Sequence, residues 1–212
     1  AITELSYLTE RYQSGIEGVE YISKLNCGVM AKNPLRGGGL IKNIPSEIKE
    51  LWDFIEEERS PRELAFDYLF DKKEISTVLT EANTLEDLKE NIKIASNSKI
   101  DCLSKNDKDL IKEIVWEYKT RKANDCSECT HCMPCPQGVD IPGCFREYNL
   151  AKMLDNPKAS AVQYYTLDEK TRADKCTHCG ECLRFCTQMI NISKDLQDTE
   201  DLFILKKNMI IY

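Results

Sequence analysis

Residues 126–136 read Cys-Ser-Glu-Cys-Thr-His-Cys-Met-Pro-Cys-Pro, and residues 176–186 read Cys-Thr-His-Cys-Gly-Glu-Cys-Leu-Arg-Phe-Cys. Two residues separate successive cysteines, except before the last cysteine of the second stretch, where three intervene. The chain has 212 residues and 11 cysteines, and eight of the cysteines lie in these two stretches. Because the total is odd and no export signal is visible, reduced thiols that bind metal are favoured over disulfides.

The spacing of these cysteines is typical of [4Fe–4S] ligation. Three sulfurs of one loop reach three irons, and in two-cluster ferredoxins the fourth cysteine of each stretch ligates the other cluster. The first cluster is therefore expected on Cys126, Cys129, Cys132 and Cys186. The second cluster is expected on Cys176, Cys179, Cys182 and Cys135.

Two departures from the bacterial ferredoxin pattern leave the fourth ligands open. The first stretch has two residues before its last cysteine where that pattern has three, and the second stretch lacks the usual proline after Cys186. Cys144 is thus an alternative ligand in place of Cys135 or Cys186. The other two cysteines, Cys27 and Cys102, are expected to be ordinary buried residues.

Structural zinc is the alternative metal. A zinc ion needs four ligands, which two Cys-x-x-Cys pairs usually supply. Each stretch here has three successive cysteine-to-cysteine spacings, which is more than a zinc site requires. A zinc-stapled interaction module is the corresponding alternative function. The only two histidines of the sequence, His131 and His178, lie inside the stretches. They are expected to face solvent, and tuning of the clusters is the alternative.

The overall composition limits the function classes. Acidic residues outnumber basic ones by 36 to 29, which disfavours nucleic acid as a partner. No apolar run approaches the ~18–20 residues of a membrane helix. We therefore expect a cytoplasmic protein that uses neither membrane nor nucleic acid. Two clusters with eight thiolates would add about four negative charges, which would suit a partner with a basic docking patch or simply aid solubility.

Upstream of the cysteines, the sequence predicts alternating strands and helices and hence a parallel sheet. Strands are expected at 2–8, 28–31 and 75–79, and helices at 13–25, 46–58, 60–70 and 84–95. Ser60-Pro61-Arg62-Glu63 is a capping-box helix start. The next helix is expected at 106–122, and the region between the cysteine stretches lacks strand alternation, which predicts helices there.

Several stretches resemble one family. Cys-Thr-His-Cys-Met-Pro-Cys-Pro-Gln-Gly-Val-Asp-Ile-Pro at 129–142 resembles the C-terminal ferredoxin-like domain of iron–sulfur aldo/keto reductase-family oxidoreductases. Tyr-Gln-Ser-Gly-Ile-Glu-Gly at 12–18 resembles the sixth βα unit of that barrel, and Ala-Lys-Asn-Pro-Leu-Arg-Gly-Gly at 31–38 resembles the end of its seventh strand. The stretches 60–65 and 86–91 resemble its seventh and eighth helices.

This resemblance implies an α/β region followed by an all-α region. Residues 1–100 would be a partial, TIM-barrel-like part of three βα units, and 101–212 a mostly helical ferredoxin-like domain with two [4Fe–4S] clusters. The family's catalytic Asp, Tyr, Lys and His lie on earlier strands and have no counterpart here. The implied function is an electron-transfer module of an oxidoreductase. A complete NAD(P)H-linked reductase would need the missing barrel portion.

The resemblance also points three residues toward a nicotinamide nucleotide, namely Leu35, Arg36 and Asn91. A glycine run at 37–39 suits a phosphate-binding loop, whereas Glu81 would repel a phosphate. Three βα units cannot close a barrel. The open sheet is therefore expected to be covered by a missing barrel subunit or in a homo-oligomer, unless the chain is a truncated product. A redox partner protein is expected to exchange electrons with the clusters.

Overall fold

The computed structural model of the chain describes residues 1–11, 14–52, 59–80 and 82–207. The chain forms two compact units, Ala1–Tyr118 and Lys119–Tyr212, and the division falls inside the helix α5 (Lys105–Thr120). Among the described residues, no helix combines the length and the apolar character that crossing a membrane requires.

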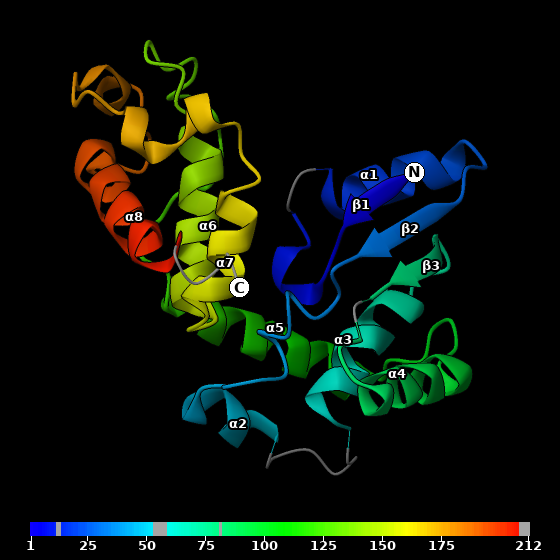
Figure 1. The fold of residues 1–212 in the computed structure, drawn as a ribbon. Coiled ribbons are helices and arrows are strands. Elements are labelled where there is room, and N and C mark those ends of the chain that lie inside the picture. The colour runs from blue at the N-terminus through cyan, green and yellow to red at the C-terminus, as the bar shows by residue number, and fades with distance from the viewer. Residues whose placement is uncertain (12–13, 53–58, 81, 208–212) are drawn as a thin grey trace. The chain divides into compact units, whose positions relative to one another are not determined.

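The first unit contains a three-stranded parallel sheet (Figure 1). Its strands β1 (Ile2–Glu4), β2 (Val29–Lys32) and β3 (Ile75–Leu79) lie in that order. The predicted parallel sheet is confirmed, but the first strand is shorter than expected. The 3-10 helix η1 (Tyr7–Thr9) follows it, and it is closed by a 2.9 Å hydrogen bond between the hydroxyls of Ser6 and Thr9.

The pairing of β3 with β2 contains a bulge. Val29 is opposite Ile75 and Met30 is opposite Thr77, so Ser76 is an extra residue in the ladder. The hydroxyl of Ser76 accepts a hydrogen bond from the backbone N–H of Val29 at 3.2 Å. The side chain thus satisfies a donor that the interrupted ladder would leave unpaired.

Helices connect the strands, and the first and third of these helices contact the sheet. The first unit contains α1 (Gly15–Lys24), α2 (Ser46–Trp52), α3 (Pro61–Phe70), α4 (Leu85–Asn97) and most of α5 (Figure 1). The predicted capping box of α3 is confirmed. The Ser60 hydroxyl accepts from the N–H of Glu63 at 3.1 Å, and the Glu63 carboxylate accepts from the N–H of Ser60 at 2.8 Å. The end of the predicted 46–58 helix lies outside the described residues.

The two faces of the sheet differ in exposure, because successive side chains of a strand point to opposite faces. Thr3 and Ala31 lie side by side in the register, and both are buried. The neighbouring row of Ile2, Met30 and Thr77 points to the other face, where Ile2 is 59% exposed. This second face leaves apolar surface uncovered within the chain.

Cys27 contradicts the expectation of a buried cysteine. Helix α1 ends at its C-cap Leu25, and Asn26 then adopts a left-handed backbone with φ 55°. The following residue, Cys27, is exposed in the turn before β2. Cys102 is half-buried, and its thiol donates to the backbone oxygen of Asp67 at 3.8 Å.

Besides the end of α5, the described part of the second unit contains three α-helices (Figure 1). They are α6 (Ile141–Met153), α7 (Pro157–Tyr164) and α8 (Ile192–Lys207), and they pack against one another. The 3-10 helices η2 (Glu169–Thr171), η3 (Ala173–Lys175) and η4 (Glu181–Arg184) lie between α7 and α8. Tyr164 is central to the core, because its ring stacks on Phe203 at 4.5 Å and its hydroxyl donates to Glu200 at 3.0 Å.

Helix α6 begins at a tightly defined cap. The carboxylate of Asp140 accepts a hydrogen bond from the backbone N–H of Gly143 at 3.0 Å. A Cβ atom on Gly143 would overlap that same carboxylate. Position 143 must therefore be glycine if Asp140 is to cap the helix. The cap in turn fixes the position of Ile141, the first residue of α6.

Candidate functional site

The two cysteine loops have a left-handed backbone at the same two positions. The third residue of each stretch is left-handed, with φ 57° at Glu128 and 56° at His178. The fifth residue is left-handed as well, with φ 63° at Thr130 and 77° at Gly180. Few non-glycine residues adopt this region, least of all a β-branched one. Left-handed residues at alternate positions turn successive backbone N–H groups into a concavity that suits anions, including iron–sulfur clusters.

The first loop lines a small, partly open cavity. Its sulfur-bearing walls are Cys126, Cys129 and Cys132 from the first loop and Cys186 from the second. The remaining walls are Ser127, Glu128, Thr130, Ile141, Pro142, Phe145, Gln188, Ile190 and Ile192. Four thiols from two loops thus surround one space with several apolar walls.

The second loop lines another small, partly open cavity. Its sulfur-bearing walls are Cys176, Cys179 and Cys182 from the second loop and Cys135 from the first. The remaining walls are Pro136, Gln137, Ile141, Thr177, Gly180, Ser193 and Leu196. Each loop therefore contributes three cysteines to its own cavity and one to the other.

The donor set of each cavity fits a cluster. All eight cysteines are free thiols. Among the residues that the structure describes, no three His, Cys, Asp or Glu side chains converge closely enough to hold a single metal ion. The four cysteines of each cavity line one shared space. That arrangement suits a group with several irons, each bound by its own thiolate.

The thiols differ in their ease of ionisation, and only thiolates ligate metal. Burial raises the pKa of Cys126 and that of Cys182, and it raises the pKa of Cys132 to about 11. Hydrogen bonds from the backbone N–H and then the side chain of His131 lower the pKa of Cys129 to about 6. Cys129 is therefore predisposed to the thiolate form before metal arrives.

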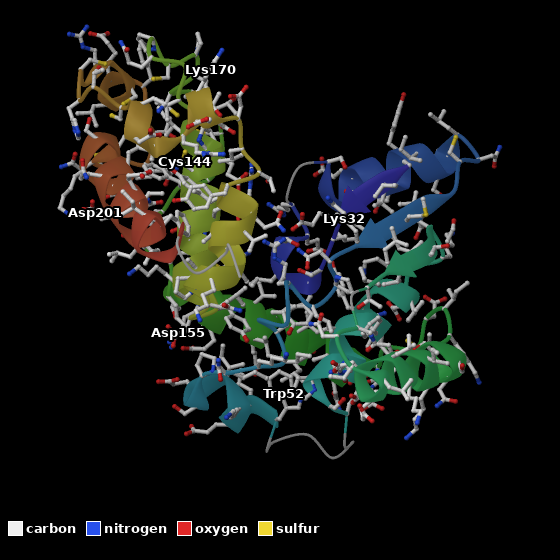
Figure 2. The ribbon with its side chains drawn as sticks, in the orientation of Figure 1. Lys32, Trp52, Cys144, Asp155, Lys170 and Asp201 are labelled. Atoms are coloured by element: carbon white, nitrogen blue, oxygen red, sulfur yellow. The ribbon has the colours of Figure 1, made fainter. Side chains whose placement is uncertain are left out.

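The two histidines are exposed, as expected for these loop positions. His131 also hydrogen-bonds the Cys129 sulfur, so it contacts a predicted ligand while facing solvent. Cys144 lies on α6 (Figure 2) and is fully buried, and its thiol donates to the backbone oxygen of Thr171 at 3.8 Å. It lines neither cavity and belongs to the core of the unit.

A network of amide side chains holds the first loop and was not predicted from the sequence. The Asn149 Oδ1 atom on α6 accepts from the backbone N–H groups of Ala123 and Asn124 at 2.9 and 3.0 Å. Asn124 in turn accepts from the N–H of Cys126 at 3.2 Å and donates to Asp195 on α8 at 3.0 Å. Apart from the local contact between Asn124 and Cys126, these partners lie 25 to 71 positions apart, so no local pattern could have indicated them.

A second unpredicted contact joins the first loop to α6. Arg146 donates two hydrogen bonds to one carboxylate oxygen of Glu128, at 2.9 and 3.1 Å. Glu128 is one of the left-handed loop residues. The ion pair therefore fixes the backbone position that shapes the first cavity.

The residues expected at a nicotinamide nucleotide all lie in the first unit and are buried there. Leu35 and Arg36 lie in the turn after β2, and the Arg36 guanidinium pairs with the buried carboxylate of Glu4. Asn91 lies on α4, and its Oδ1 atom accepts from the Arg62 guanidinium at 2.8 Å. Both polar side chains are thus engaged by partners inside this unit. Residues 12, 13 and 81, on which the sequence-based predictions also relied, lie outside the described residues.

Comparison with known proteins bears mainly on the cysteine region. Residues 125–190 match the family model described as a 4Fe-4S dicluster domain. No curated protein matches the chain. Among solved structures, an aldo-keto reductase from Bacillus halodurans in its holo form matches with 19% identity and a TM-score of 0.42. The match covers 53% of this chain and 41% of the reductase, so the chain spans about two fifths of that protein's length.

Proposed function

We propose that this chain is an electron-transfer module with two [4Fe–4S] clusters. The first would be held by Cys126, Cys129, Cys132 and Cys186, and the second by Cys176, Cys179, Cys182 and Cys135. The observation that carries the proposal is the pair of cavities, each lined by three cysteines of one loop and one of the other. The dicluster family match over 125–190 supports it. When bound, such clusters accept and donate single electrons.

The chain's own residues would hold and shield these sites. Apolar side chains, Phe145 and Ile192 among them, wall the first cavity and restrict water. Asn149 anchors the first loop through the N–H groups at its start. Cys129 and Cys179 are exposed, which lets a redox partner approach one ligand of each site. Free thiols as metal ligands are consistent with a reducing cytoplasm.

We further propose that the module belongs to a larger oxidoreductase of the aldo/keto reductase family. The quoted sequence stretches and the parallel βα units of the first unit support this assignment. The sheet ends at β1 and β3 in the described region, and Ile2 and Leu79 are 59% and 42% exposed. A missing barrel subunit, a redox partner protein or a second copy of the chain would cover this surface.

The two alternatives have less support. A complete NAD(P)H-linked reductase would need nucleotide ligands, yet Arg36 and Asn91 are already paired with Glu4 and Arg62. A zinc-stapled module needs only four ligands around one atom, and it does not account for the 4Fe-4S dicluster match over 125–190.

Iron and acid-labile sulfide analysis of the full chain, purified without oxygen, tests the proposal. Two clusters require about eight irons and eight sulfides per chain and a brown colour that dithionite bleaches. The Cys27→Ser variant is the matched control, because Cys27 is exposed and lines neither cavity. Stoichiometric zinc without sulfide would contradict the proposal. Oxidation of NADPH by the chain alone would favour the reductase alternative.

A further inference from the structure

The residue after the last cysteine of the second stretch departs from the bacterial ferredoxin pattern. Thr187 stands where that pattern has proline, whereas Pro136 follows the last cysteine of the first stretch. Proline has neither a hydroxyl nor a backbone N–H, so it cannot donate a hydrogen bond. Threonine donates through its hydroxyl. The departure therefore adds a side-chain donor next to Cys186, which lines the first cavity.

The Thr187 hydroxyl contacts a cysteine of the other loop. Its Oγ1 atom lies 3.8 Å from the Sγ atom of Cys129, 58 positions away in the chain. His131 and Ser127, which also donate hydrogen bonds to that sulfur, belong to the first loop itself. Thr187 thus connects the second loop to a sulfur-bearing wall of the first cavity.

The direction of this hydrogen bond follows from the chemistry of its two partners. Between a hydroxyl and a thiol, either atom can donate. A cysteine that ligates iron is a thiolate and can only accept, so the Thr187 hydroxyl must then be the donor. The Gln188 side-chain amide donates to the Thr187 oxygen at 3.5 Å, which leaves the hydroxyl proton available for the Cys129 sulfur.

A turn holds Thr187 in this place. The backbone N–H of Met189 donates to the carbonyl oxygen of Cys186 at 3.2 Å, so Thr187 is the second residue of a four-residue turn that begins at a predicted ligand. Thr187 and Cys129 are both exposed. A substitution at position 187 therefore changes the contact without opening the core.

Resting on the proposed function, we infer that Thr187 raises the reduction potential of the cluster at Cys126, Cys129, Cys132 and Cys186. Reduction makes a thiolate-ligated cluster more negative, and a donor to one of its sulfurs stabilises the more negative state. Hydrogen bonds to ionised acceptors are roughly twice as strong as neutral ones, so this bond should strengthen when an electron is added.

A redox titration of the full chain, followed by electron paramagnetic resonance, tests this inference. Thr187→Val keeps the branched shape but replaces the hydroxyl by a methyl group, which also keeps water from that side of the sulfur. Reduction of the first cluster should become about threefold to tenfold less favourable, which lowers its one-electron wave by about 28 to 59 mV. The wave of the second cluster should not move. Thr187→Ser retains the hydroxyl and should keep both waves in place.

Three further variants complete the experiment. Cys126→Ser changes a ligand of the first site, so it should shift or abolish only the wave of that site and thereby identify it. Thr187→Ala removes the hydroxyl but leaves room for water, so it should lower the same wave by less than Thr187→Val does. Thr166→Val is the matched control and should move neither wave, because the exposed Thr166 hydroxyl donates to the backbone oxygen of Gln163 at 2.6 Å and lines neither cavity.

The outcomes separate this inference from the proposed function. If the two waves coincide in the unmodified chain, Thr187→Val should separate them. A change of less than about twofold, or about 18 mV, in both Thr187→Val and Thr187→Ala would overturn the inference alone. So would a shift in Thr187→Ser as large as that in Thr187→Val. Absence of iron and sulfide from the unmodified chain would overturn the proposed function and the inference together.

Discussion

Replacing Asn149 by alanine removes the anchor of the first cysteine loop. The Asn149 side chain is buried at 6% exposure and accepts hydrogen bonds from the N–H groups of Ala123 and Asn124 at 2.9 and 3.0 Å. It also donates to the Asn124 side chain at 3.2 Å. That side chain in turn accepts from the N–H of Cys126, so the change reaches the first ligand of the first cavity.

The magnitude follows from the two lost backbone contacts. Each hydrogen bond contributes about 1 kcal/mol net, so the loop should be destabilised by roughly 2 kcal/mol. A difference of 1.4 kcal/mol is a factor of ten, so opening of the loop should become about thirtyfold more frequent. If chelators reach the site through this opening, the first cluster should be lost about thirtyfold faster.

The assay is the anaerobic decay of cluster absorbance after addition of an iron chelator. Asn156→Ala is the matched control, because Asn156 caps α7 through Ala159 at 3.3 Å and lines neither cavity. Losing that cap costs about 1 kcal/mol elsewhere in the unit. An Asn149→Ala rate equal to that of the unmodified chain, or equal to that of Asn156→Ala, would refute the reasoning.

Three further substitutions test the packing of both units. Gly143→Ala should displace the Asp140 cap of α6, cost about 1 kcal/mol, and lower the melting temperature of the metal-loaded protein; an unchanged melting temperature would contradict the cap. Tyr164→Phe leaves the buried N–H of Ala173 unpaired and should cost about 1–3 kcal/mol in urea denaturation followed by circular dichroism, whereas an unchanged midpoint would count against it. Ser60→Ala removes the capping box of α3 and should cost about 1 kcal/mol, with Ser60→Asp expected to recover most of the loss.

Local signals predicted much of the first unit. The β-branched run at 75–79 forms β3 with the predicted bounds, and the Ser60 capping box forms as its spacing indicates. The first strand is shorter than predicted, because a hydrogen bond between the hydroxyls of Ser6 and Thr9 stabilises a turn there. Cys27 was predicted buried from residue type alone, whereas the left-handed Asn26 turns it outward.

The cysteine loops show the limit of spacing as a predictor. Spacing predicts which cysteines share a cluster, and each predicted set of four lines one cavity. It could not indicate that Ile141 lines both cavities or that Asn149 anchors the first loop. Both facts depend on how α6 packs against segments that are distant in the chain. The identity of a side chain alone does not predict that packing.

The crossed assignment of ligands is tested most directly by native-state alkylation with mass spectrometry on two variants. In Cys186→Ser, we expect Cys126, Cys129 and Cys132 to become labelled, while the other site stays protected. In Cys135→Ser, the labelled set should be Cys176, Cys179 and Cys182. Labelling of Cys176, Cys179 and Cys182 in Cys186→Ser would mean that each loop holds its own cluster with all four of its cysteines, and the account would be wrong.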